Sequence, residues 1–159
     1  MDSTDALALR TLLQRQPVAS LATLHQGEPA ISMVPYALLP GGQGFVIHVS
    51  ELATHTHDMQ SNPAVGLMVT ATLDGSASPL SLPRASVRGR AQRCEAGSPE
   101  HALARDCYLA KLPQSEELFS FADFSLFVIT AHSLRFVAGF GRAMSITAVQ
   151  FAAVMDASA

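Results

Sequence analysis

The chain has 159 residues, of which 48% are hydrophobic and only 14% are charged, and its net charge is −3. The length suits a single domain over residues 1–159, and the lack of a basic excess argues against nucleic-acid binding. No apolar run approaches the ~20 residues of a membrane span, and the first ten residues lack the apolar segment of a secretory signal, so we expect a cytoplasmic protein without membrane contact.

The N-terminal half of the chain alternates strand and helix signals. Ser3-Thr4-Asp5 is a favourable helix start, and Pro17 ends that helix. Gln26-Gly27 and the glycine-rich residues 40–44 predict turns between strands. Asn62-Pro63 ends a second, polar helix. The predicted elements are a helix from residue 3, strands at residues 18–25, 30–39, 45–49 and 64–72, and a helix at residues 53–61.

The C-terminal half opens with a polar loop and a long strand, and then becomes helical. Ser98-Pro99-Glu100 combines an N-cap, a proline in the first turn and an acid, which together predict a helix start. The run 124–129 is apolar on both faces and predicts a central buried strand, continued beyond a bulge. The remaining predicted elements are a loop at residues 73–82, strands at 84–94 and 134–137, a helical segment at 114–121 after Pro113, and a weak helix at 147–155.

These elements indicate a fold class. About six strands with hairpin connections and a few helices favour a mainly β (α+β) domain. We predict an antiparallel barrel with peripheral helices.

The start of the helix near residue 53 is a candidate anion site. The first backbone N–H groups of a helix lack partners, and the helix dipole is positive there. Polar side chains crowd this point after an apolar strand, namely Ser50, Thr54, His55, Thr56 and His57. A ligand that carries a phosphate group is therefore the first functional hypothesis.

Arginines are concentrated on the strand RASVRGRAQR. Arg84, Arg88 and Arg90 share one face by the period-two alternation of a strand, and Arg93 lies on the other. Such a face can clamp a phosphate through bidentate hydrogen bonds. The alternative is a solvated outer face of a barrel strand.

The histidines and cysteines do not form a metal-binding pattern. His55 and His57 are two residues apart and point in nearly opposite directions on a helix. No acid stands at a metal-ligand spacing, so we predict no metal site. Cys94 and Cys107 are expected to be free thiols of a reducing cytosol.

The segment Gly139-Phe140-Gly141-Arg142 resembles the start of a dinucleotide-binding motif, but too little chain follows for a βαβ unit. The glycines allow a tight path or the close approach of a ligand. Arg142 is a candidate to reach an anion across a subunit boundary, and a simple turn is the alternative. Because candidate catalytic acids and bases are few, we expect the chemistry to come from a cofactor.

Four stretches together resemble the FMN-binding split-barrel superfamily, in its pyridoxamine-5′-phosphate-oxidase-like branch. They are PVASLATLHQGEPAISMVPYALL, GFVIHVSELATHTHDMQSNPAVGLMV, RASVRGRAQR and DFSLFVITAHSLRFVAGFGRA, and they cover most of the chain. The last two, with the His-Thr stretch, look most like the haem-utilisation subgroup of that branch. The resemblance implies a homodimer of split β-barrels with two flavin sites at the interface, which would account for the low charged fraction.

The resemblance also assigns site residues, all of them as implications of the family pattern. The second strand would line the flavin with its backbone, and the third strand and the following helix start would hold the phosphate. The partner subunit would contribute from the later strand and the C-terminal loop. These cofactor-binding residues are Ser32, Met33 and Val34, then His48, Val49, Ser50, His55 and Thr56, and from the partner Arg84 and Arg142.

The chain departs from the family pattern at two points. Pyridoxamine-phosphate oxidases place an Arg-Lys pair at the helix start, where this chain has Thr54-His55. The haem-degrading relatives use a histidine from a C-terminal loop, and no histidine follows His132. We therefore expect an FMN-dependent oxidoreductase acting on a small molecule of unknown identity. The alternatives are a haem-binding or haem-degrading protein on the same fold and a flavin-binding module without turnover.

Overall fold

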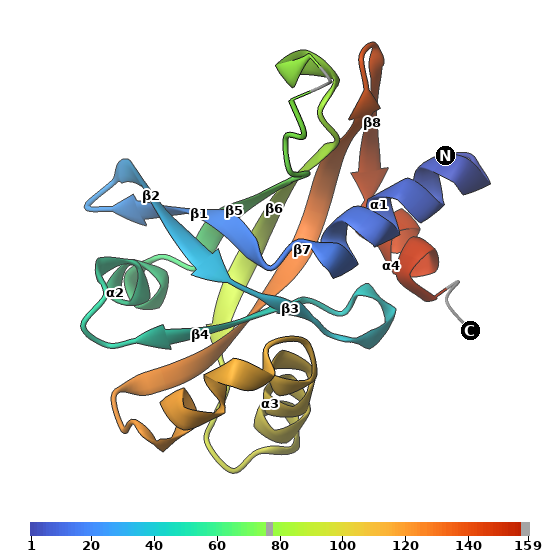
Figure 1. The fold of residues 1–159 in the computed structure, drawn as a ribbon. Coiled ribbons are helices and arrows are strands. Elements are labelled where there is room, and N and C mark those ends of the chain that lie inside the picture. Colours follow the sequence, from blue (N-terminus) through green and yellow to red (C-terminus); the bar gives the residue numbers. More distant parts are fainter. Residues whose placement is uncertain (76–77, 157–159) are drawn as a thin grey trace.

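The computed structural model describes residues 1–75 and 78–156, so part of the predicted loop 73–82 and the last three residues of the predicted domain lie outside the described residues. Eight strands form one sheet in this part of the chain (Figure 1). They are β1 (Val18–His25), β2 (Glu28–Pro35), β3 (Ala37–Leu38), β4 (Phe45–Ser50), β5 (Ala64–Thr70), β6 (Arg84–Arg93), β7 (Phe124–Gly139) and β8 (Arg142–Thr147).

The helices lie around this sheet. The α-helices are α1 (Ser3–Arg15), α2 (Thr54–Ser61), α3 (Pro99–Lys111) and α4 (Ala148–Asp156). The short 3₁₀ segments are η1 (Pro40–Gly42), η2 (Pro79–Ser81) and η3 (Pro113–Ser120). Asp2 and Ser98 cap α1 and α3 by accepting hydrogen bonds from the backbone N–H groups of Asp5 and His101, which lie in the first turns of these helices.

All strand pairs are antiparallel, in the order β2-β1-β5-β6-β7-β4-β3, with β8 added to β7. The chain runs directly from β2 at one end of this order to β3 at the other, so the sheet must curl on itself. The predicted antiparallel split barrel with peripheral helices is confirmed. The Gln26-Gly27 turn is also confirmed, since both residues have the positive φ angles, 52° and 84°, of a tight hairpin turn.

The structure corrects two details of the sequence reading. The predicted strand at residues 30–39 is broken at Tyr36, whose buried hydroxyl donates to the Leu13 carbonyl at 2.6 Å and whose N–H donates to the Pro17 carbonyl. The chain leaves β1 here and crosses to β4. The glycines at 139 and 141 flank the turn of a hairpin that leads into β8, a strand that the sequence reading missed.

Two apolar clusters hold the fold together. The larger one fills the inside of the curled sheet, and Leu9, Leu12 and Leu13 of α1 pack into it. The smaller one lies outside β3 and β4, beneath α3, and includes Tyr108, Leu112 and Leu126. The outer side of the sheet is therefore covered by α3 at β3 and β4, whereas the outer side from β2 to β6 carries no helix among the described residues (Figure 1).

Candidate functional site

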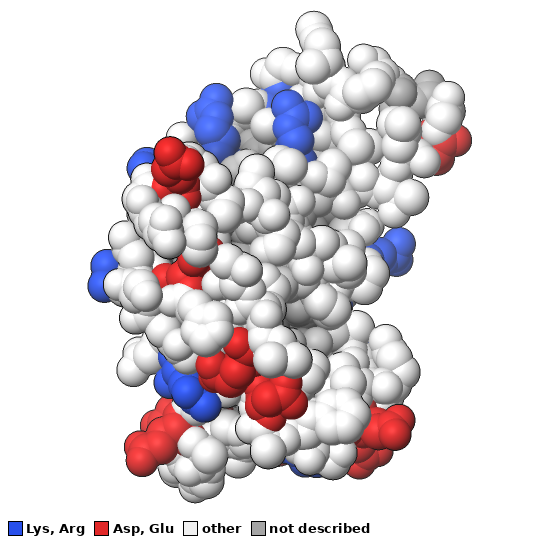
Figure 2. All heavy atoms as spheres, turned by 90° about the vertical axis from the view of Figure 1, so that its left-hand side faces the viewer, with Lys and Arg blue, Asp and Glu red and all other residues white. Residues whose placement is uncertain are grey.

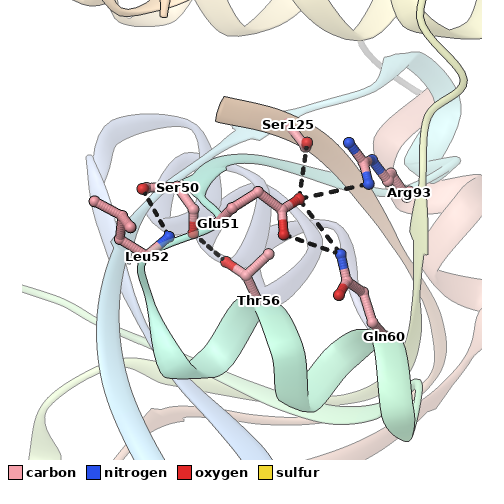
Figure 3. A network of polar contacts seen from close by, with 7 residues as sticks. All are labelled: Ser50, Glu51, Leu52, Thr56, Gln60, Arg93 and Ser125. Atoms are coloured by element: carbon pink, nitrogen blue, oxygen red, sulfur yellow. Dashed lines mark hydrogen bonds and ion pairs between the residues drawn. The ribbon is translucent and has the colours of Figure 1, made fainter. Parts of the chain in front are cut away.

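The start of α2 is built without a side-chain cap. Ala53 occupies the N-cap position, and the Thr56 N–H donates to the Ala53 carbonyl. The Thr56 side chain is fully buried, and its Oγ1 donates to the Ser50 carbonyl at 2.7 Å (Figure 3). This hydroxyl therefore anchors α2 to β4 and does not face a ligand.

The turn between β4 and α2 is held by a polar network (Figure 3). The Ser50 hydroxyl donates to Asp123 Oδ2 at 2.6 Å and accepts from the Leu52 N–H at 3.0 Å. The Glu51 carboxylate accepts hydrogen bonds from the side chains of Gln60 and Ser125 and pairs with Arg93 at 3.4 Å. The predicted phosphate site therefore has a carboxylate close by, and its serine hydroxyl is already engaged.

His55 is the predicted residue that best fits a ligand-facing position at α2. Its Nδ1 lies 3.1 Å from the Ser32 hydroxyl of β2, which joins two of the predicted site residues. Burial lowers the pKa of His55, although the nearby Asp58 acts in the opposite direction. The imidazole is therefore biased towards its neutral form, which hydrogen-bonds a phosphate but adds no charge.

Asp58 fixes α2 against the β1–β2 hairpin. Its buried carboxylate accepts a hydrogen bond from Thr23 Oγ1 at 2.9 Å and lies 2.7 Å from His25 Nδ1. Burial alone would raise the pKa of Asp58, but the hydrogen bonds from His25 and Thr23 outweigh it and hold that pKa below its ordinary value. This carboxylate is a structural hydrogen-bond partner within the chain.

His48 lies on the opposite side of the sheet from the α2 start. It is 8% exposed and stacks on Phe119 with ring centroids 3.9 Å apart, and Tyr108 and Phe124 flank it. Its Nδ1 is buried without a hydrogen-bond partner among the described residues. Burial, with a smaller effect of His101, lowers its pKa to about 4. The structure thus separates His48 from His55 and places it under α3.

The predicted positions on β2 and β4 alternate between the two sides of the sheet. Val34 and Val49 belong to the inner core, so only their backbones are free to face a ligand. Met33 points to the outer side and is 65% exposed. Within this one chain, the side chains of Ser32 and His55 meet, and Thr56 binds the backbone carbonyl of Ser50.

Arg84 and Arg142 lie far from α2 in the same chain. Arg84 begins β6 and pairs with Thr70 at the end of β5, whereas α2 lies next to Ala64 at the start of β5. The two ends of this strand pair are about 20 Å apart. The Arg84 guanidinium donates to the Leu82 carbonyl at 3.0 Å. Arg142 binds Asp5 of α1 at 2.5 Å, on the far side of the molecule from α2 (Figure 1). The assignment of both arginines to a partner's site stays a prediction.

The uncovered outer side of β2, β1, β5, β6 and β8, together with β7 from Thr130 onward, is called here the open face and has two halves. On β1, Ser20 lies between Met33 of β2 and Met68 of β5, and Ala22 lies between Ile31 of β2 and Gly66 of β5. The strands β2, β1 and β5 therefore carry an apolar half. The half on β6 and β7 carries the exposed basic side chains Arg88, Arg90, His132 and Arg135.

The basic half of the open face contains no acidic residue. Of the six strands of the whole face only β2 contains one, Glu28, at its first position and opposite His25. Charged side chains are also sparse across the middle of the neighbouring side, where α2 and the β1–β2 hairpin lie (Figure 2). The open face therefore combines apolar area with uncompensated positive charge, a combination suited to an amphiphilic anion.

Sequence reasoning did not place His132 among the cofactor-binding residues. The expected bulge between residues 129 and 134 could have drawn attention to His132, because a bulge changes the side of the sheet to which a side chain points. The structure confirms this bulge as a register shift opposite Arg88 and Gly89. No group of three or more metal-binding side chains occurs in residues 1–75 and 78–156. None of the described helices combines the length and apolarity needed to cross a bilayer.

Two relatives carry names that mention haem. The chloroplast protein called non-canonical heme oxygenase HOZ, from Arabidopsis thaliana, is 31% identical over 134 residues, which are 82% of this chain and 39% of that protein. A solved heme binding protein from Mycobacterium smegmatis is 31% identical, with a TM-score of 0.85 over 96% of this chain and 62% of that one. This chain thus spans less than two thirds of either relative.

Further likenesses concern the fold. ChuZ from Campylobacter jejuni is 24% identical, with a TM-score of 0.81 over 92% of this chain and 61% of its own. The family model described as pyridoxamine 5′-phosphate oxidase matches residues 7–138, which hold β1 to β6 and most of β7. The chain belongs to the pyridoxamine 5′-phosphate oxidase family.

Proposed function

We propose that this protein binds haem, a flat tetrapyrrole with apolar faces and two carboxylate groups, on its open face. The observation that carries this proposal is the division of that face into an apolar half and a basic half without acids. Each half matches one part of the ligand. The two relatives whose names mention haem, at 31% identity, support the same choice.

The apolar half supplies the area that a porphyrin ring needs. Ile31, Met33 and Met68 are 77%, 65% and 43% exposed, although they are large apolar side chains. Covering them removes apolar surface from water at about 25 cal/mol per Å². Methionines adapt their shape and make favourable contacts with aromatic rings, so this half fits a flat conjugated ligand.

The basic half supplies partners for carboxylates. The side chains of Arg88 and Arg90 have no ion pair or hydrogen bond within the described part of the chain, and the Arg135 guanidinium donates one hydrogen bond there, to the Ser145 hydroxyl at 3.2 Å. Arginine binds carboxylates through two parallel hydrogen bonds. When bound, haem supplies one-electron and oxygen chemistry, and this chain's residues would hold and orient it.

A second copy of the chain is the partner that we propose for the open face. The apolar half is too exposed for an isolated chain, and a twofold contact would cover the part of it that the ligand leaves exposed in both copies. A homodimer also agrees with the charged fraction of 14%. In such an assembly the ligand would lie at the edge of the contact. Within this proposal the protein acts in the cytoplasm.

Titration with hemin tests this proposal. Purified protein is expected to give a saturable Soret band, and Met33→Glu is expected to weaken hemin binding at least tenfold, about 1.4 kcal/mol. The new carboxylate disrupts the apolar half and repels the haem carboxylates. Val149→Glu is the matched control, because Val149 is an 80% exposed apolar residue on α4. An absent Soret shift, or equal affinities for both variants, contradicts haem binding here.

FMN is the second candidate ligand, and the contact between His55 and Ser32 favours it. The two residues join the α2 start to β2, whose outer edge pairs with no other strand of the described chain. The N–H groups that remain free at a helix start attract a phosphate, although that of Thr56 is already bound to the Ala53 carbonyl here. We rank FMN below haem because no Lys or Arg stands at this start and Glu51 lies close to it.

A comparison of FMN with riboflavin tests the second candidate, because the two differ only in the phosphate. If the α2 start holds that phosphate, FMN should bind at least tenfold more tightly than riboflavin. Quenching of flavin fluorescence measures both affinities, and His55→Ala should reduce only that of FMN. Equal binding of the two flavins would remove α2 from the site. If FMN is the ligand, we propose that the protein is a flavin-dependent oxidoreductase.

A further inference from the structure

A bulge brings basic side chains together between β6 and β7. In their register Arg88 pairs with Ser133 and Gly89 pairs with Ala131, so His132 has no opposite residue. Ala131 and Leu134 are buried, whereas His132 is exposed and Ser133 is partly exposed. Two consecutive side chains therefore leave the inner core, and the bulge aims His132 to the side of the sheet that carries Arg88 and Arg90.

Gly89 makes this local geometry possible. A Cβ atom at residue 89 would lie 2.5 Å from the carbonyl oxygen of Thr130 and 3.2 Å from its carbonyl carbon. Both are backbone atoms of β7, so a side chain cannot be accommodated by a rotamer change. The close approach of the two strands at Gly89 is thus part of how the bulge is built.

The bulge lies beside a depression of about 350 Å³. Three of its lining residues carry basic side chains, Arg88, Arg90 and His132, and we call them the bulge cluster. The remaining lining residues are Ala64, Val65, Gly89 and Ser133, so no carboxylate faces the depression. Across residues 1–75 and 78–156, neither arginine of the cluster has an ion pair.

This lack of counter-ions is unusual for the composition of the chain. The chain has 13 acidic residues and only 10 Lys and Arg, yet two of those ten adjoin one depression with no acid. Like charges that share a small concave site repel each other unless an anion lies between them. The cluster is therefore arranged for a ligand that brings negative charge.

We propose that the bulge cluster is a binding site for a compact oxyanion, a phosphate or carboxylate group. Arg88 and Arg90 would donate charge-assisted hydrogen bonds to its oxygens, with the Ser133 hydroxyl and His132 as further donors. The group can belong to a free anion or to a larger ligand of the open face, such as haem. The site itself does not depend on the proposed function.

Binding of inorganic phosphate tests the site directly. Calorimetric titration of the full chain is expected to show saturable binding, weakened at least tenfold in the double variant Arg88→Gln/Arg90→Gln. Arg15→Gln is the matched control, because Arg15 is an exposed arginine at the end of α1 and does not line the depression. Backbone amide shifts in an NMR titration should be largest at residues 88–90 and 130–133. Absent saturation, or equal weakening by the control, overturns the proposal.

Titration with hemin in the presence of phosphate distinguishes a free anion from a carboxylate group of haem. If the cluster holds the haem carboxylates, phosphate competes with hemin and the double variant loses affinity for both. If the anion is free, phosphate binds alongside hemin and only phosphate affinity falls in the double variant. If the protein binds phosphate but no hemin, the anion site is supported and the proposed haem binding is contradicted.

Discussion

Gly89→Ala is expected to destabilise the protein by about 2–3 kcal/mol, the cost of forcing extra volume into a tight contact. The new Cβ would overlap the Thr130 carbonyl oxygen at 2.5 Å and approach Ile129 Cγ2 at 3.1 Å. Because β6 and β7 are the central strands of the sheet, their separation would disturb the inner core on both sides. Urea denaturation of the two proteins measures the difference.

Gly66→Ala is the matched control for this substitution. Gly66 lies in the neighbouring strand β5, where an added Cβ would meet only Ala22 Cβ and the Val87 carbonyl oxygen, both at 3.6 Å. An alanine loses less conformational entropy than a glycine in a strand, so this variant should be unchanged or about 0.5 kcal/mol more stable. Equal losses for the two variants would contradict the role assigned to the contact between Gly89 and Thr130.

Between pH 7 and pH 5 the protein is expected to lose about 2 kcal/mol of unfolding free energy because of His48, and His48→Phe is expected to remove this loss. The imidazole is buried against Phe119, and burial lowers its pKa from 6.5 to about 4. Between these values the unfolded chain binds a proton at His48 and the folded chain does not, so stability falls as the pH falls. Each pH unit in this window costs up to about 1.4 kcal/mol. Phenylalanine keeps the stacked ring and cannot titrate.

Denaturation of both proteins at pH 7 and pH 5 measures this effect. The loss of unfolding free energy between the two pH values should be about 2 kcal/mol smaller in the variant. Titrating groups that do not interact with His48 contribute equally to both proteins and cancel in the comparison. Identical losses in the two proteins would show that His48 is free to charge in the folded state.

The local features of the fold could be read from the sequence because they depend on neighbouring residues. Gln26-Gly27 forms the expected turn, and Ser98 caps α3 as its side chain and the following proline indicate. The alternation of buried and exposed residues along β6 follows from its apolar pattern. The family could also be recognised, because the order of such segments is itself a pattern along the chain.

The site could be predicted only in part, because its contacts join distant residues. The sequence grouped His48 with His55, yet α3 packs over the side of β4 that carries His48. It offered the Ser50 hydroxyl to a phosphate, but Asp123 from 73 residues away occupies it. Arg142 is likewise taken by Asp5, 137 residues away. None of these partners can be inferred from local preference.

The sequence by itself determined most of the strands, the Gln26-Gly27 turn, the Ser98 cap and the family, since backbone preference and apolar alternation act over a few residues. Tertiary structure alone decided which side of each strand is covered, which polar groups bind each other and which remain free. The bulge cluster illustrates the difference: Arg88 and Arg90 share a strand face in the sequence, but His132 joins them through the register shift between β6 and β7. That register depends on how the whole sheet curls and packs.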